Sequence, residues 1–207
     1  MKIRELIDSI NIFDVKVSFD DWKTMQLNGD IIYFTPVDGK ERTKYERIYR
    51  KEKFVSTSAC IHFPDLNVSD IIDIYKNCDG SGMYDFTCNL ILEHCKNIVN
   101  MDEAFIVFIF LHEVGHWKQF NKLKCNVKLF EEMDMDLEKD NFNKMRELQE
   151  QRNERWKRGN TCIQTAKEKR LAEQYMREYR CIPKEKEADE FALTKIKDSL
   201  NLLYSKQ

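Results

Sequence analysis

The sequence predicts an α+β fold that is built around one buried helix. Residues 104–111 are eight consecutive apolar residues, and a helix that is apolar on every side lies inside a protein. Segments with strand composition precede this run, between residues 13 and 63. The chain contains only 6 Gly and 3 Pro, which favours long helices over flexible linkers. These observations predict a small sheet followed by a largely helical body.

Length and composition restrict the class of protein. A chain of 207 residues is typical of one domain, here residues 1–207, with a substantial core. Its net charge is −2, so no basic bias indicates direct binding of nucleic acid. The seven Cys are scattered without a CxxC pair, which indicates neither a disulfide framework nor a cysteine zinc site. The N-terminus lacks the features of a signal peptide, and the longest apolar run is far below the ~18 residues of a membrane span. We therefore expect a cytoplasmic protein without a membrane partner.

The first part of the chain combines one helix with short strands. Residues 1–12 have the spacing of an amphipathic helix. Residues 13–63 favour β-structure, with one strand at 30–35 after an Asn28-Gly29 turn and another at 54–63 that stops before Pro64. The charged segment 42–50 is compatible with either a helix or a strand.

Helices dominate the remainder. Residues 69–77 and 83–99 have helical spacing. Asn100, followed three residues later by Glu103, resembles a capping box and predicts the start of the buried helix, which covers 103–120.

The buried helix carries the sequence HEVGH. A helix places positions i and i+4 on one face, so His112 and His116 project side by side and could hold one metal ion. Glu113 lies about 100° further round, close enough to reach a water on that metal. Zinc peptidases use this arrangement, with two imidazole ligands and a carboxylate that accepts a proton from water. The alternative is a helix whose two His lie on the surface or are hydrogen-bonded in the core, but a buried His-Glu-His set needs partners that a metal would supply.

A third ligand is expected because catalytic zinc normally takes three protein ligands. Pro183 suits the first position of a later helix, whose apolar stripe contains Ala188, Phe191, Ala192 and Ile196. At about 100° per residue, Glu185 falls within the span of this stripe. Asp189 lies one turn further on, where it could accept a hydrogen bond from the outer nitrogen of a ligand His. An amphipathic helix with exposed acids is the alternative, and His62 and His94 are weaker ligand candidates.

Together, HEVGH and Glu185-x-x-Ala188-Asp189-x-Phe191-Ala192 resemble the gluzincin metallopeptidases. The second of these motifs is most similar to the ImmA/IrrE family, whose pattern is HExxH followed by E-x-E-A-N-x-F-A. This chain has Asp189 where that family usually has Asn. The E-x-x-A-D variant is also similar to the HtpX-like peptidases, which are membrane proteins. The resemblance implies a zincin-like (minigluzincin) fold with a small sheet, a buried HExxH helix, a following glutamate helix and a zinc cofactor.

The distance from His116 to Glu185 is much longer than in the ImmA/IrrE family. A charged stretch, at about 128–180, fills it and predicts a helical insertion that Gly159-Asn160 divides into two helices. One interpretation is a solvated helical hairpin. The other is an insertion that guards the cleft or recognises a partner.

The functional hypothesis is a zinc-dependent endopeptidase. His112, His116 and Glu185 would bind Zn²⁺, Glu113 would act as the general base, and strand 54–63 would bind an extended protein or peptide substrate. Tyr175, Tyr179 and His62 are candidates for stabilising the oxyanion. The family resemblance implies a regulatory protease of the phage or mobile-element type that acts on a transcriptional repressor or another cytoplasmic protein. The alternative is a catalytically silent zincin-fold protein that acts as a binding partner, although the intact Glu113 favours the enzyme.

Overall fold

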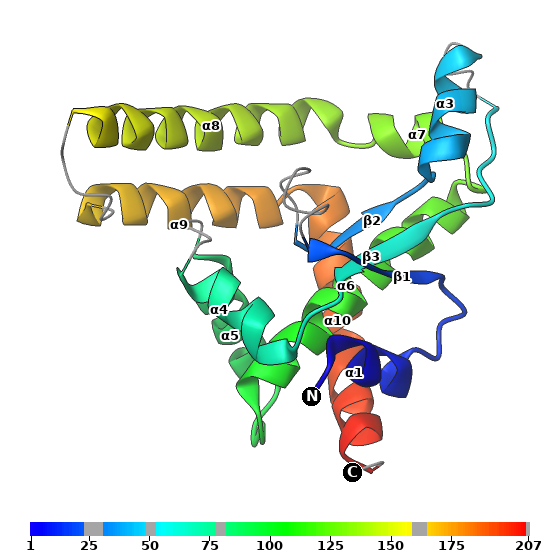
Figure 1. Ribbon diagram of the computed structural model, residues 1–207, viewed down its shortest axis with the longest axis horizontal. Helices are drawn as coiled ribbons and strands as arrows, with labels where there is room; N and C mark the ends of the chain where they lie inside the picture. Colours follow the sequence, from blue (N-terminus) through cyan, green and yellow to red (C-terminus); the bar gives the residue numbers. More distant parts are fainter. Residues whose placement is uncertain (23–30, 49–52, 78–81, 159–164, 206–207) are drawn as a thin grey trace.

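The structure is a computed structural model that describes residues 1–22, 31–48, 53–77, 82–158 and 165–205. It is an α+β protein, mostly helical, with one three-stranded sheet (Figure 1). The prediction of the α+β class is confirmed. In chain order the elements are α1 (Ile3–Ile10), β1 (Val17–Asp20), β2 (Tyr33–Thr35), α3 (Gly39–Arg47), β3 (Cys60–Pro64), α4 (Val68–Asn77), α5 (Met83–His94), α6 (Met101–Lys122), α7 (Val127–Glu132), α8 (Met135–Lys157), α9 (Ala166–Arg180) and α10 (Pro183–Ser205).

The sheet has the order β1-β3-β2. Strand β1 runs parallel to β3 and β2 runs antiparallel to it, so that Val17 and Phe34 both lie opposite Ile61. Because β3 is hydrogen-bonded on both sides, the expectation that strand 54–63 offers a free edge to a substrate is wrong. Within the described part of the chain, the edges belong to β1 and β2.

Strand 54–63 is also shorter than predicted, since regular pairing begins at Cys60. In the preceding residues the hydroxyls of Ser56, Thr57 and Ser58 all donate hydrogen bonds to the Glu41 carboxylate. Hydroxyl side chains compete with the strand ladder when a local acceptor is available, and Glu41 is such an acceptor. The predicted turn at Asn28-Gly29 lies outside the described residues.

Helix α3 occupies a region that the sequence pattern predicted as β-rich. Asp38 caps the helix by accepting hydrogen bonds from the backbone N–H groups of Lys40 and Glu41. Tyr45 is the buried residue of this helix, and it joins a second apolar cluster that includes Phe120 and Phe130. A good N-cap and one large buried side chain therefore stabilise a helix in an otherwise charged segment.

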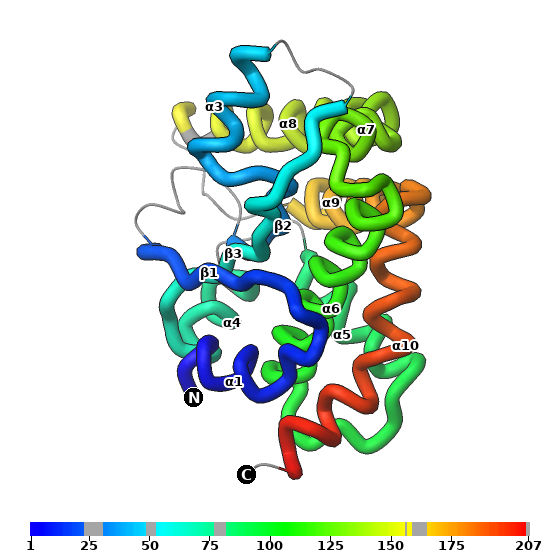
Figure 2. The backbone as a smooth tube through the Cα atoms, turned by 90° about the vertical axis from the view of Figure 1, so that its right-hand side faces the viewer, coloured from blue at the N-terminus to red at the C-terminus, as the bar shows by residue number. Residues whose placement is uncertain are grey.

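Helix α6 passes through the centre of the molecule, with α10 alongside it (Figure 2). Asn100 caps it as predicted, accepting hydrogen bonds from the N–H groups of Asp102 and Glu103. Every residue from 104 to 116 is buried, because α4, α5, α10 and the sheet all pack against this helix. No helix among the described residues is long and apolar enough to cross a membrane.

The stretch 128–180 consists mainly of two long antiparallel helices, α8 and α9, that extend from the body of the molecule (Figure 1). The predicted break at Gly159-Asn160 lies outside the described residues. Helix α9 buries Ala172, Met176 and Arg180, which are spaced four residues apart and therefore lie on one face.

Helices α6 and α10 lie very close together at Gly115. A Cβ added to Gly115 would lie 2.8 Å from the Cα and 3.0 Å from the Cβ of Ala188. Those distances are too short for carbon atoms, so this crossing requires a glycine on α6 opposite Ala188 of α10. The contact sets how far apart the two helices lie.

We predict that Gly115→Ala lowers the free energy of unfolding by about 1–3 kcal/mol, because the extra methyl group meets the backbone of α10. Alanine is the better helix former, so a loss of stability would be due to the crossing and not to α6 itself. Gly39→Ala is the matched control, since nothing lies within 4 Å of the added Cβ there. Urea denaturation of both variants measures the difference, and equal stabilities would show that the crossing has room for a side chain.

Candidate metal centre

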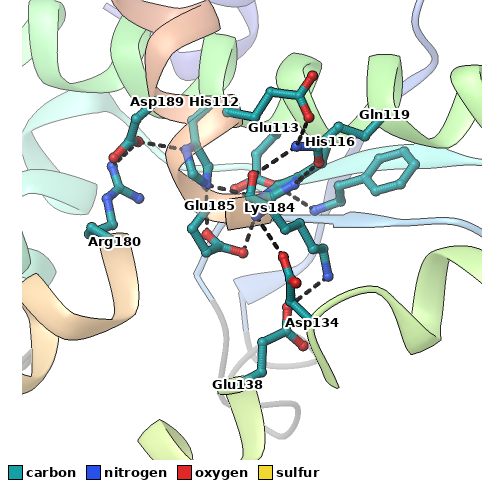
Figure 3. Close-up of polar contacts among 12 residues, drawn as sticks. His112, Glu113, His116, Gln119, Asp134, Glu138, Arg180, Lys184, Glu185 and Asp189 are labelled. Carbon is teal, nitrogen blue, oxygen red and sulfur yellow. Dashed lines mark hydrogen bonds and ion pairs between the residues drawn. The ribbon is translucent and has the colours of Figure 1, made fainter. Parts of the chain in front are cut away.

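Three buried side chains from two helices converge on one point. Helix α6 supplies His112 and His116, whose Nε2 atoms lie 3.1 Å apart, and α10 supplies Glu185 (Figure 3). The Glu185 oxygens lie 3.2 Å from Nε2 of His112 and 3.5 Å from Nε2 of His116. Ligand atoms of a tetrahedral zinc site with bonds of 2.0–2.1 Å are about 3.3 Å apart. This buried His-His-Glu group could therefore hold a metal ion.

The outer nitrogen of each imidazole has a hydrogen-bond acceptor. Nδ1–H of His112 donates to Asp189 Oδ1 at 2.9 Å, and Nδ1–H of His116 donates to Gln119 Oε1 at 2.9 Å. The orientation of the Gln119 amide is set by its Nε2, which donates to the Lys184 carbonyl at 2.7 Å. With the protons on Nδ1, both Nε2 atoms direct lone pairs toward the centre of the group.

A cation would resolve an otherwise unfavourable arrangement at this centre. Glu185 is only 2% exposed, and its Oε2 accepts no hydrogen bond from any residue that the structure describes. Although burial opposes ionisation, the neighbouring His116 and His112 hold the pKa of Glu185 well below its usual range. A buried carboxylate oxygen beside two imidazole lone pairs therefore has the chemistry of a metal-ligand set.

The pKa of His112 also reflects an environment that favours positive charge. Burial and the Arg180 charge lower the pKa of His112, but Asp189 and Glu185 outweigh them and raise it to about 9. The carboxylates around the two imidazoles thus attract a cation strongly.

Arg180 completes the surroundings of His112. Its Nη2 lies 2.6 Å from Oδ1 of Asp189, so this carboxylate is shared between the guanidinium and the imidazole (Figure 3). Arg180 and Asp189 are 4% and 7% exposed. No sequence pattern singles out Arg180, because it is one charge among many in the stretch 128–180 and belongs to no motif. Gln119 was not predicted either, although its position three residues after His116 places it on the same helix face.

The charges at the centre are unbalanced among the protein groups alone. Glu113, Glu185 and Asp189 are buried carboxylates, and Arg180 is a buried guanidinium that pairs with Asp189. Lys184 is close by, but its Nζ forms an ion pair with Glu138 at 2.8 Å. With both imidazoles neutral, as metal ligands must be, the three acids when ionised exceed the guanidinium by two charges, which a divalent cation would neutralise.

Glu113 lies between the two His and strand β2. Its Oε2 accepts a hydrogen bond from the backbone N–H of Phe34 at 2.8 Å. Burial raises the pKa of Glu113, and the charges of His112 and His116 oppose this shift. A raised pKa moves a carboxylate toward the range in which it exchanges protons near neutral pH.

The His-His-Glu group opens into a cavity of about 430 Å³. Its walls come from the segment leading into β2, from α6 and from the helices α8 and α9. Tyr179, one of the residues considered for the oxyanion, lines this cavity, and burial together with Glu185 raises its pKa well above the usual value. His62 instead lies within the sheet and pairs with Asp20 at 2.6 Å, and His94 is exposed on α5.

No protein-family model, no curated protein and no solved structure matches this chain. The fold and the centre define an α+β protein with a buried candidate metal centre beside a cavity.

We predict that Arg180→Met lowers the free energy of unfolding by about 3–5 kcal/mol, because Asp189 would remain as a buried charge without its guanidinium. Adding Asp189→Asn should restore much of this loss, since an amide oxygen still accepts the His112 Nδ1–H and no unpaired charge remains. Urea denaturation of the two single variants and the double variant measures this coupling. If the double variant loses the sum of the unfolding free energies lost by the two single variants, Arg180 and His112 do not share the Asp189 carboxylate as described.

Proposed function

We propose that this chain is a zinc-dependent endopeptidase of the gluzincin type. The observation that carries the proposal is the convergence of His112, His116 and Glu185, with both imidazole Nε2 atoms directed at one point. Two imidazoles and one carboxylate are a ligand set of catalytic zinc sites. The adjoining cavity supports a catalytic role, because a catalytic zinc site keeps one position open to solvent and substrate.

The residues around the centre support peptide hydrolysis. Bound zinc would supply a Lewis acid that lowers the pKa of water and polarises a peptide carbonyl. The Glu113 carboxylate takes a proton from the attacking water and transfers it to the leaving amine. Asp189 and Gln119 hold the protons on Nδ1 of the two ligand imidazoles, which keeps each Nε2 available as a ligand atom.

The edge strand nearest to this chemistry is β2, since Phe34 binds Glu113 directly. We assign to β2 the role of aligning an extended substrate, in place of β3. The resemblance of Glu185-x-x-Ala188-Asp189-x-Phe191-Ala192 to the ImmA/IrrE pattern supports a zincin-like architecture. It also supports a regulatory protease that acts on a transcriptional repressor or another protein of the cytoplasm.

Metal analysis combined with casein hydrolysis tests this function. The parent protein should bind one zinc ion and cleave casein. Glu113→Gln should retain the zinc but lose about 10²- to 10⁴-fold in rate, because only the proton acceptor is removed. Glu185→Ala should lose zinc, whereas Glu190→Ala, on the exposed face of the same helix, should retain both zinc and activity.

The outcomes separate the alternatives. Equal rates for the parent and Glu113→Gln would rule out the general base. Stoichiometric zinc without hydrolysis in either protein would indicate the catalytically silent binding partner. A parent protein that binds no zinc would rule out the proposed centre.

A further inference from the structure

The cavity beside the His-His-Glu group has an apolar end. Ile109 lies one turn before His112 on α6, so it lines the cavity on the N-terminal side of His112. Met176 lies one turn before Arg180 on α9 and lines the same cavity. Tyr75 and Met83 line the same end, where the Tyr75 ring contacts Phe105 of α6 with 4.9 Å between centroids. The opposite end lies near His116, whose ring is 6.4 Å from that of Phe130.

The helices α8 and α9 form the outer wall of this cavity. Met145 comes from α8 and Met176 from α9, and both face the cavity although the surface of these helices is highly charged. Contacts between the helices hold the wall in place. Asn141 Nδ2 donates to the Tyr175 carbonyl at 2.9 Å, and Lys144 forms an ion pair with Glu178 at 3.1 Å.

The charges that line the cavity are either paired or part of the proposed metal centre. Among the described lining residues the cations are Arg180 and Lys184, which bind Asp189 and Glu138. The acids are Glu113 and Glu185, which belong to the proposed catalytic centre. A charged substrate side chain at the apolar end would lose its hydration without gaining a partner, whereas an apolar side chain would be buried favourably.

We propose that this apolar end, which we define as Tyr75, Met83, Ile109, Met145 and Met176, is a specificity pocket for a large apolar side chain of an extended peptide. The α8–α9 hairpin thereby selects the substrate. Three of its five residues are methionines, whose flexible side chains adapt to different shapes, so the pocket accepts Leu, Met and Phe alike. This inference deepens the proposed function and rests on it.

Peptide binding to the Glu113→Gln protein, loaded with zinc, tests the pocket without turnover. The probes are two fluorescent peptides of Gly and Ser that differ in one central residue, Leu or Asp. Fluorescence anisotropy should show that the Leu peptide binds about 10- to 100-fold more tightly. Adding Met145→Lys should reduce the affinity for the Leu peptide by about tenfold or more, because a charge then lies in the wall.

Met135→Lys is the matched control, since Met135 lies on the same helix, is 50% exposed and does not line the cavity. This change should leave the affinity for the Leu peptide unaltered. Met176→Ala provides a second test, because it removes part of the wall without adding charge and should also weaken binding of the Leu peptide. Zinc content and circular dichroism of each variant verify that the centre and the fold are intact.

Equal affinities for the Leu and Asp peptides, or no binding of either, would contradict the proposed specificity pocket. So would a folded Met145→Lys variant that binds the Leu peptide as well as the Met135→Lys control does. A failure of the proposed function can be recognised separately, because the parent protein would then bind no zinc or would not cleave casein. A protein that cleaves casein without discriminating between the peptides would contradict the specificity pocket alone.

Discussion

The close crossing of α6 and α10 is the constraint on which the centre depends. Gly115 lies between the two His in the sequence and faces Ala188, which lies between Glu185 and Asp189 in α10. Because neither residue carries a bulky side chain, the two backbones approach closely enough for Glu185 to reach both Nε2 atoms. The same approach places Asp189 against His112 Nδ1. One small-residue contact therefore sets both the ligand group and its hydrogen-bonded support.

The electrostatics of the centre follow from this packing. Burial alone would disfavour ionised acids, yet the structure buries three carboxylates near the two imidazoles, and a guanidinium pairs with one of them. Arg180 stabilises Asp189, Asp189 orients His112, and Gln119 orients His116. Such a network is favourable only when its charges are compensated, which is why we propose that a divalent cation belongs to the folded protein.

The charged hairpin has two faces with different roles. Its outer face carries ion pairs that are largely exposed to solvent, such as Arg158 with Glu154, and pairs of this kind contribute little to stability. Its inner face supplies Met176, Tyr179 and Arg180 to the cavity and the centre. The two interpretations of the stretch 128–180 are therefore compatible, since one surface is solvated while the other lines the cavity.

The sequence by itself determined the features that depend on helical periodicity and local capping. The four-residue spacing predicts that His112 and His116 share a face, Asn100 predicts the start of α6, and the stripe around Ala188 predicts that Glu185 faces inward. Only the tertiary structure decided that β3 is central, that residues 39–47 form a helix and that Arg180 and Gln119 support the His-His-Glu group. Backbone hydrogen bonds set the local periodicity, so it is visible in the sequence. Contacts such as Arg180 with Asp189, or Ser56 with Glu41, join separate elements and leave no periodic pattern, because they depend on how those elements pack.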